Sequence, residues 1–136
     1  MTKTLMAIAL VLVALALPAM AQNPLTLTAG SATGSLAATG SVTLAINALA
    51  SAAAWQLTGT FSGTVTFEGT VDGTTWVAVA VVPVGGTRTL TTTATAAGVW
   101  QMNVAGFASA RARVSTYTSG TFVITGKRAA GPSPAQ

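Results

Sequence analysis

Short runs in which apolar and polar residues alternate fill most of the chain between residues 41 and 126. Most runs end at a glycine-containing turn, and the turns recur about every 8–12 residues, the spacing typical of a β-sandwich. A period of two residues places apolar side chains on one face of an extended strand, whereas a helix needs a period of about 3.6. The pattern therefore predicts an all-β chain that folds as a single antiparallel β-sandwich.

The individual strands follow from the alternation and from the turns between them. They are predicted at 25–28, 41–48, 54–59, 63–71, 75–82, 87–93, 99–104, 109–117 and 121–126. Segment 29–40 consists almost entirely of Gly, Ala, Ser and Thr, and we interpret it as a loop or a loose sheet edge. Segment 49–54 is rich in alanine, the best helix former, so a helical turn is an alternative there.

The N-terminus has the parts of a secretory signal peptide. Lys3 supplies a positive start, residues 5–17 form an uninterrupted apolar run, and Pro18 ends it. Ala19-Met20-Ala21 then gives the small-x-small pattern of a cleavage site. An uncleaved anchor is the alternative, but the apolar run is shorter than the ~20 residues that span a bilayer.

The expected organisation is therefore a signal helix at 1–21, one sandwich domain at 24–128 and a disordered tail at 129–136. This arrangement predicts a secreted or cell-surface protein that meets a membrane only through its signal segment.

The pair Asp72-Gly73 lies between two alternating runs, which is a strong signal for a hairpin with a two-residue loop. Such a loop pairs Val71 with Thr74, Gly69 with Trp76, Phe67 with Ala78 and Val65 with Ala80. Large side chains would then lie opposite small ones, as packed sheets require. We therefore predict that these residues form the core-facing side of the hairpin.

Large aromatic side chains are expected in the core, because they dominate the burial energy of a small sandwich. The predicted core aromatics are Trp55, Phe67, Trp76, Trp100 and Phe122. The alternative for the tryptophans is an exposed platform that stacks on a sugar.

Local sequence motifs resemble known β modules. Residues 65–79, VTFEGTVDGTTWVAV, resemble the strand–turn–strand of discoidin-like, galactose-binding-like jelly rolls, in which a DG-x-x-W turn joins two strands. Residues 110–114, ARARV, are similar to the penultimate strand of those modules. Together with residues 55–59 and 117–121, the pattern also resembles small β-sandwich proteins of phage and prophage genomes. The resemblance implies a jelly roll that binds glycans or membranes, or one that lies on a virion surface.

The side chains that most enzymes use are missing from the sequence. The chain has no cysteine and no histidine, which excludes thiol chemistry, imidazole bases and nearly every zinc site. Glu68 and Asp72 are the only carboxylates, and Asp72 already has a role in the predicted turn. We therefore expect no enzymatic activity, no metal and no cofactor.

The charge of the chain is small but uneven. A formal net charge of +4 arises because six cations face two acids, and charged residues make up only 6% of the chain. The cations are scattered, whereas nucleic-acid binding needs a dense basic stripe, so no nucleic-acid partner is expected. A surface with so little charge is typical of an exported protein, or of one whose faces are covered by copies of itself.

Two functions fit these observations. The first is a non-catalytic exported module that binds carbohydrate or another surface polymer. The second is a structural subunit, either a phage decoration or adsorption protein or a self-assembling surface protein. Arg111, Arg113 and Tyr117 alternate on one predicted strand face and are the candidate contact residues, since arginine beside tyrosine is common at interfaces.

Overall fold

The computed structural model describes residues 30–129, and within them the backbone forms ten strands and no helix. The strands are β1 (Ser31–Leu36), β2 (Gly40–Ala45), β3 (Ala52–Thr58), β4 (Phe61–Thr70), β5 (Val77–Ala78), β6 (Val81–Pro83), β7 (Thr93–Ala94), β8 (Gly98–Asn103), β9 (Ser109–Gly120) and β10 (Phe122–Arg128). The predicted all-β class is therefore confirmed for this part of the chain. Its residues contain no helix of a length and apolarity that would cross a membrane.

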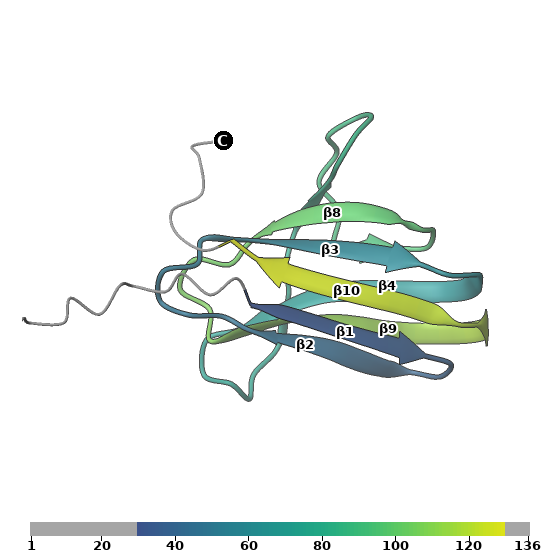
Figure 1. The fold of residues 1–136 in the computed structure, drawn as a ribbon, viewed down its shortest axis with the longest axis horizontal. Helices are drawn as coiled ribbons and strands as arrows, with labels where there is room; N and C mark the ends of the chain where they lie inside the picture. The colour runs from purple at the N-terminus through teal and green to yellow at the C-terminus, as the bar shows by residue number, and fades with distance from the viewer. Residues whose placement is uncertain (1–29, 130–136) are drawn as a thin grey trace, which may run out of the picture.

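The strands form two sheets with interleaved connectivity. One sheet has the order β1-β10-β3-β8-β6, and the other has the order β2-β9-β4-β5, with β7 also pairing with β4. Figure 1 shows β8, β3, β10 and β1 as one layer and β4, β9 and β2 as the layer behind it. Consecutive strands from β1 to β4 alternate between the two sheets, and every pairing is antiparallel. The architecture is β-sandwich-like.

The core lies between the two sheets and consists of the alternating inward side chains of both. Phe67 of β4 contacts Trp100 of β8 with ring centroids 5.6 Å apart, and Phe61 stacks on Phe122 at 4.1 Å. Each contact joins one sheet to the other. Trp55, Phe67 and Phe122 are fully buried, and Trp100 is nearly so. Removing this much aromatic surface from water supplies a large share of the stabilisation of a domain that has no disulfide.

The segment that we interpreted as a loop or loose edge contains β1, which pairs with β10 over six residues and forms one edge of its sheet. Small residues permit this, because β1 packs closely against β2: a Cβ on Gly34 would lie 2.6 Å from Val42 Cγ2. The segment considered as a possible helical turn instead leads into β3, which begins at Ala52.

The predicted register of the hairpin at Asp72-Gly73 is wrong by one residue. In the structure Gly69 pairs with Val77 and Glu68 with Ala78, rather than Gly69 with Trp76. Only Gly73 has a positive φ, 82°, so the connection is not the tight two-residue turn in which both central residues need one. A shift of one residue moves every side chain of a strand to the opposite face. On the β5 side, Val79 in place of Ala78 therefore comes opposite Phe67 and donates its N–H to the Phe67 carbonyl, and Ala78 is exposed.

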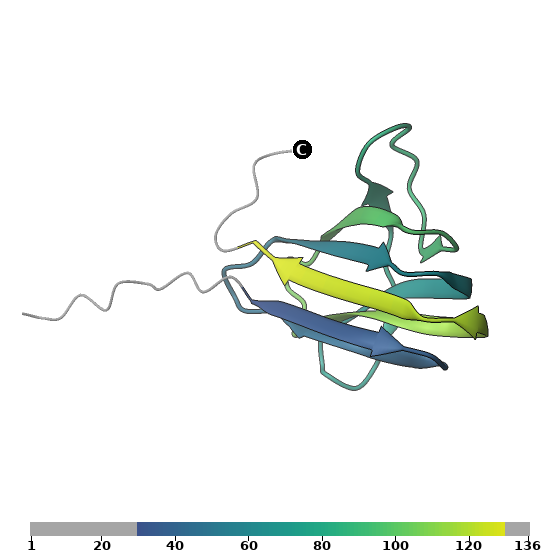
Figure 2. The same cartoon turned by 45° about the vertical axis from the view of Figure 1, so that its right-hand side comes forward.

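The strand predicted at 75–82 is divided between the two sheets. Its first part, β5, pairs with β4, whereas β6 pairs with β8 in the other sheet. Val81 is fully buried at this crossover. The strand predicted at 87–93 is largely irregular, and the segment between β6 and β7 projects from the body (Figures 1 and 2). Gly85 and Gly86 both have positive φ there, which favours a bend over an extended strand.

Three predictions lie wholly or partly outside the described residues: the signal peptide at 1–21, the strand at 25–28 and the tail at 129–136. Ala129 is described, and its N–H donates to the carbonyl of Ala52.

Candidate binding surface

The outer face of the sheet that contains β4 and β9 carries a cluster of paired charges. Glu68 on β4 lies directly opposite Arg111 on β9. Arg111 Nε donates to Glu68 Oε2 at 2.5 Å, and Arg113 Nη2 donates to Glu68 Oε1 at 2.8 Å. The side chain of Glu68 is only 8% exposed, compared with 22% for Arg111 and 40% for Arg113. One carboxylate therefore fixes two arginines on the surface.

The electrostatics of the cluster favour the ionised forms of Glu68 and Arg113. Burial by itself raises the pKa of the Glu68 carboxyl, but the hydrogen bonds from Arg113 and Arg111 outweigh it, so the pKa lies below the ordinary 4.5. The hydrogen bond to Glu68 in turn raises the pKa of Arg113. The three groups together carry one surplus positive charge.

Trp76 belongs to this surface and not to the core, where we predicted it. Its indole lies under Arg111, with the guanidinium carbon 4.1 Å from the ring centroid, and the residue is partly exposed. The one-residue register shift accounts for the difference, because it moves Trp76 to the face opposite Phe67. We call Glu68, Trp76, Arg111 and Arg113 the arginine–tryptophan cluster.

The prediction that Tyr117 lies on the same strand face as Arg111 and Arg113 is wrong. Two register irregularities in the β4–β9 pairing make Ser115 and Thr118 extra residues of β9, with no residue of β4 directly opposite them. An extra residue in a strand inverts the alternation beyond it. Tyr117 consequently packs against the core, with its ring 6.3 Å from Phe122, and its hydroxyl donates to the carbonyl of Gly120.

Asp72 organises the loop between β4 and β5. Its carboxylate accepts hydrogen bonds from Thr74 N–H at 2.8 Å and Thr75 N–H at 2.6 Å, and from the hydroxyls of Thr75 and Thr70. The bonds from the backbone of Thr75 and Thr74 hold the pKa of Asp72 well below its ordinary 3.8. Asp72 and Gly73 thus form a turn as predicted, although it is a longer one.

The two acids predict how stability changes in acid. Both folded-state pKa values are depressed, so the stability they contribute is present above their ordinary values of 3.8 and 4.5 and is lost as pH falls through the folded values. The urea concentration at which half of the protein is unfolded should therefore stay constant from about pH 7 to about pH 5.5 and should decrease towards pH 3. The variant Asp72→Asn should show a shallower acid fall, because it has no carboxylate to protonate at this position. If this decrease of stability in acid is unchanged in both Asp72→Asn and Glu68→Gln, the two carboxylates are not its cause.

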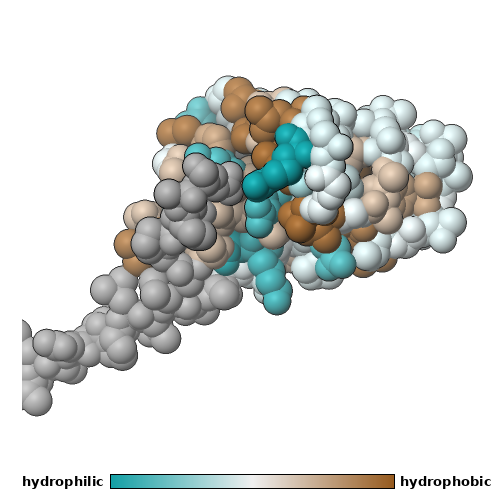
Figure 3. Space-filling model, turned by 90° about the horizontal axis from the view of Figure 1, so that it is seen from above, coloured by the Kyte–Doolittle hydropathy of each residue, from teal (hydrophilic) through white to brown (hydrophobic). Residues whose placement is uncertain are grey.

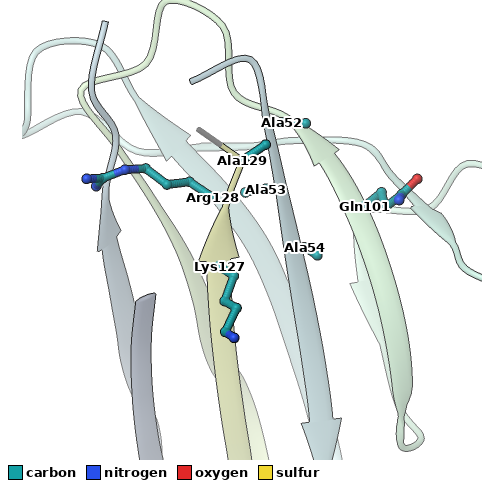
Figure 4. A pocket seen from close by; sticks show the side chains of 7 residues that line it. All are labelled: Ala52, Ala53, Ala54, Gln101, Lys127, Arg128 and Ala129. Carbon is teal, nitrogen blue, oxygen red and sulfur yellow. The ribbon is translucent and has the colours of Figure 1, made fainter. Parts of the chain in front are cut away.

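A shallow hollow of about 270 Å³ lies on the outer face of the other sheet, around the ends of β3 and β10. Figure 4 shows that Ala52 and Ala54 lie between Gln101 and Lys127, while Arg128 extends to the opposite side. Arg128 is already engaged, because its Nη1 donates to the carbonyl of Ala45. The hollow thus offers methyl groups, one ammonium and one amide, which is a weaker recognition surface than the arginine–tryptophan cluster.

The projecting segment between β6 and β7 exposes apolar side chains. Val84 is 54% exposed and Leu90 66%, and Arg88 lies between them in an exposed run. Figure 3 looks onto the side from which this segment projects, where brown apolar areas lie beside large pale ones. Within residues 30–129, no three potential metal-ligating side chains (His, Cys, Asp or Glu) form a group.

No known family model matches the chain, and no curated protein matches it. Among solved structures, the chain is similar to the SPBc2 prophage-derived protein YomS, with a TM-score of 0.60 and 13% sequence identity. The alignment covers 72% of this chain and 93% of YomS. The likeness is one of fold.

A prophage-derived protein is thus a structural neighbour, which agrees with the sequence resemblance to small phage β proteins. The finer resemblance to galactose-binding-like modules stays a prediction.

Proposed function

We propose that this protein is a non-catalytic module that binds a surface polymer, and that the arginine–tryptophan cluster makes the contact. One observation carries the proposal: Arg111 is held between Glu68 and Trp76, yet its terminal Nη groups donate to no other atom in the described part of the chain. A cation that is fixed but still has free donors pays little entropy when it binds. Trp76 adds an aromatic surface, which is the composition of binding hot spots.

The proposal of a non-catalytic role is supported by the way the two carboxylates are used. Glu68 is neutralised by two arginines, and Asp72 accepts hydrogen bonds within its own loop. Neither is poised to accept a proton near pH 7, because both pKa values are depressed. The sequence offers no histidine or cysteine in their place.

The setting that we propose is a cell surface or a phage particle, with export by the N-terminal segment in the cellular case. The prophage origin of the neighbour supports the phage setting. The strand orders β1-β10-β3-β8-β6 and β2-β9-β4-β5 also support the proposed jelly-roll type, since strands that follow each other in the chain lie in opposite sheets, except for β4 and β5. Carbohydrate is the polymer that we favour.

Immobilised polysaccharides test the proposal directly. We expect saturable binding of the protein to at least one polymer, and loss of most of that binding in the double variant Trp76→Ala/Arg111→Ala. The matched control is Arg88→Ala, which removes an arginine from the projecting segment and should bind as the unmodified protein does. Absence of binding across neutral and charged polysaccharides would reject the proposed function.

A second candidate is a structural subunit that assembles with copies of itself. The specific observation in its favour is the exposure of Val84 and Leu90 on the projecting segment, because large apolar side chains that are exposed on one loop suit an interface. Sedimentation separates the candidates: a monomer that binds polymer fits the first, and a defined oligomer without polymer binding fits the second.

A further inference from the structure

The ligand that the arginine–tryptophan cluster would recognise can be narrowed from its charge. Two guanidinium groups share a single carboxylate, so one positive charge on the cluster has no counter-charge from Glu68. Asp72, the other acid of the chain, has its carboxylate oxygens engaged by its own loop. A neutral ligand would leave the surplus charge unpaired, whereas an anionic group would pair with it.

The free donors of Arg111 define the geometry of that pairing. Its Nε is used by Glu68, and its planar guanidinium is held over Trp76, so its orientation is set before any ligand arrives. Within residues 30–129 no hydrogen bond holds the Nη groups. Because they are also not buried, they face solvent. A guanidinium edge presents two parallel N–H donors, which match the two oxygens of a carboxylate or phosphate.

The surface beside these donors suits a sugar ring. Trp76 is partly exposed, and its chain neighbours Thr75 and Val77 are both exposed. The apolar C–H face of a sugar packs on an aromatic or aliphatic surface, while hydroxyls such as that of a threonine exchange hydrogen bonds with its polar rim. Arg111 and Trp76 could therefore bind the anionic group and the apolar face of one sugar at the same time.

We propose that Arg111 and Trp76 form a subsite for an anionic glycan, with its acidic group on the Nη atoms of Arg111 and its sugar ring against Trp76. This inference rests on the proposed function and names its ligand class. The acidic group is either a uronate carboxylate or a phosphate diester, because both present two oxygens to a guanidinium edge.

The test uses three polymers and two matched variants of the protein. The polymers are polygalacturonate, its fully methyl-esterified form, which has the same sugars without the charge, and poly(ribosyl-ribitol phosphate), in which phosphate diesters join units that contain a sugar ring. The variants are Arg111→Lys, which keeps the charge but loses the two-donor edge, and Arg88→Lys, which makes the same change on the projecting segment. Thermal melts of both variants verify that they fold.

We expect one of the two anionic polymers to bind and the methyl ester not to bind. Arg111→Lys should weaken that binding about tenfold, as expected when a two-pronged hydrogen bond is replaced by a single one. Arg88→Lys should leave it unchanged. Preference for polygalacturonate identifies a carboxylate, and preference for poly(ribosyl-ribitol phosphate) identifies a phosphate.

Two outcomes would overturn the inference while the proposed function survives. One is binding of the methyl ester as tightly as of polygalacturonate. The other is equal weakening by Arg111→Lys and Arg88→Lys, which indicates diffuse charge attraction without a site. If none of the three polymers binds, the inference fails, and the proposed function fails with it when the wider set of neutral and charged polysaccharides also gives no binding.

Discussion

Replacing Phe67 with alanine is expected to lower the free energy of unfolding by about 3–5 kcal/mol, the range for deleting a buried aromatic side chain. Phe67 is fully buried, packs on Trp100 across the core at 5.6 Å between ring centroids, and lies opposite the small Ala112. Its removal would leave a cavity between the two sheets that the surrounding strands cannot close. Equilibrium urea unfolding followed by tryptophan fluorescence gives the value.

The matched variant is Trp76→Ala, which removes a larger aromatic side chain from the same hairpin. It should cost only about 1 kcal/mol, because Trp76 lies on the outer face and gives up a single cation–π contact with Arg111. The comparison tests the register itself. Similar losses of several kcal/mol in both variants would place the two aromatic residues on the same face and contradict the pairing of Gly69 with Val77.

Removal of the Glu68 carboxylate is expected to have the second-largest effect. Glu68→Ala should lower the free energy of unfolding by about 2–4 kcal/mol, since breaking a largely buried ion pair leaves charges without a partner. Here two guanidinium groups on the same strand face, Arg111 and Arg113, would be left to repel each other. Partial solvation of Arg113 places the loss towards the lower end of that range.

A double-mutant cycle assigns the loss to the ion pairs. Arg113→Ala alone should cost less than Glu68→Ala, because the pair of Glu68 with Arg111 persists. The double variant Glu68→Ala/Arg113→Ala should lose less free energy of unfolding than the two single variants lose together, because the repulsion between the arginines is absent. Strict additivity would show that Glu68 and Arg113 do not interact.

The alternation in the sequence predicted the positions of most strands, because a period of two residues is a local property of the chain. The strands predicted at 41–48, 54–59, 63–71, 99–104, 109–117 and 121–126 overlap β2, β3, β4, β8, β9 and β10. β1 was missed as a definite strand because its side chains are small and give no contrast between faces. The strand predicted at 75–82 could not show that it changes sheets, since both of its parts alternate.

Only part of the candidate surface could be predicted from the sequence. Arg111 and Arg113 were recognised as outward residues by their alternation with alanine, and they do lie on the outer face. Glu68 had no recognised role, because its position opposite Arg111 depends on the pairing of strands more than forty residues apart. The available signal was a lone acid on a strand in a chain with only two acids.

The sequence by itself determined the all-β class, the alternating core and the absence of imidazole and thiol groups. Tertiary structure decided which face Trp76 and Tyr117 occupy and which charges meet Glu68. The physical reason is that alternation repeats every two residues and so cannot distinguish a register from its one-residue shift. A longer turn at Asp72, which is held by hydrogen bonds within its own loop, and two extra residues in β9, which arise in its pairing with the distant strand β4, made that choice.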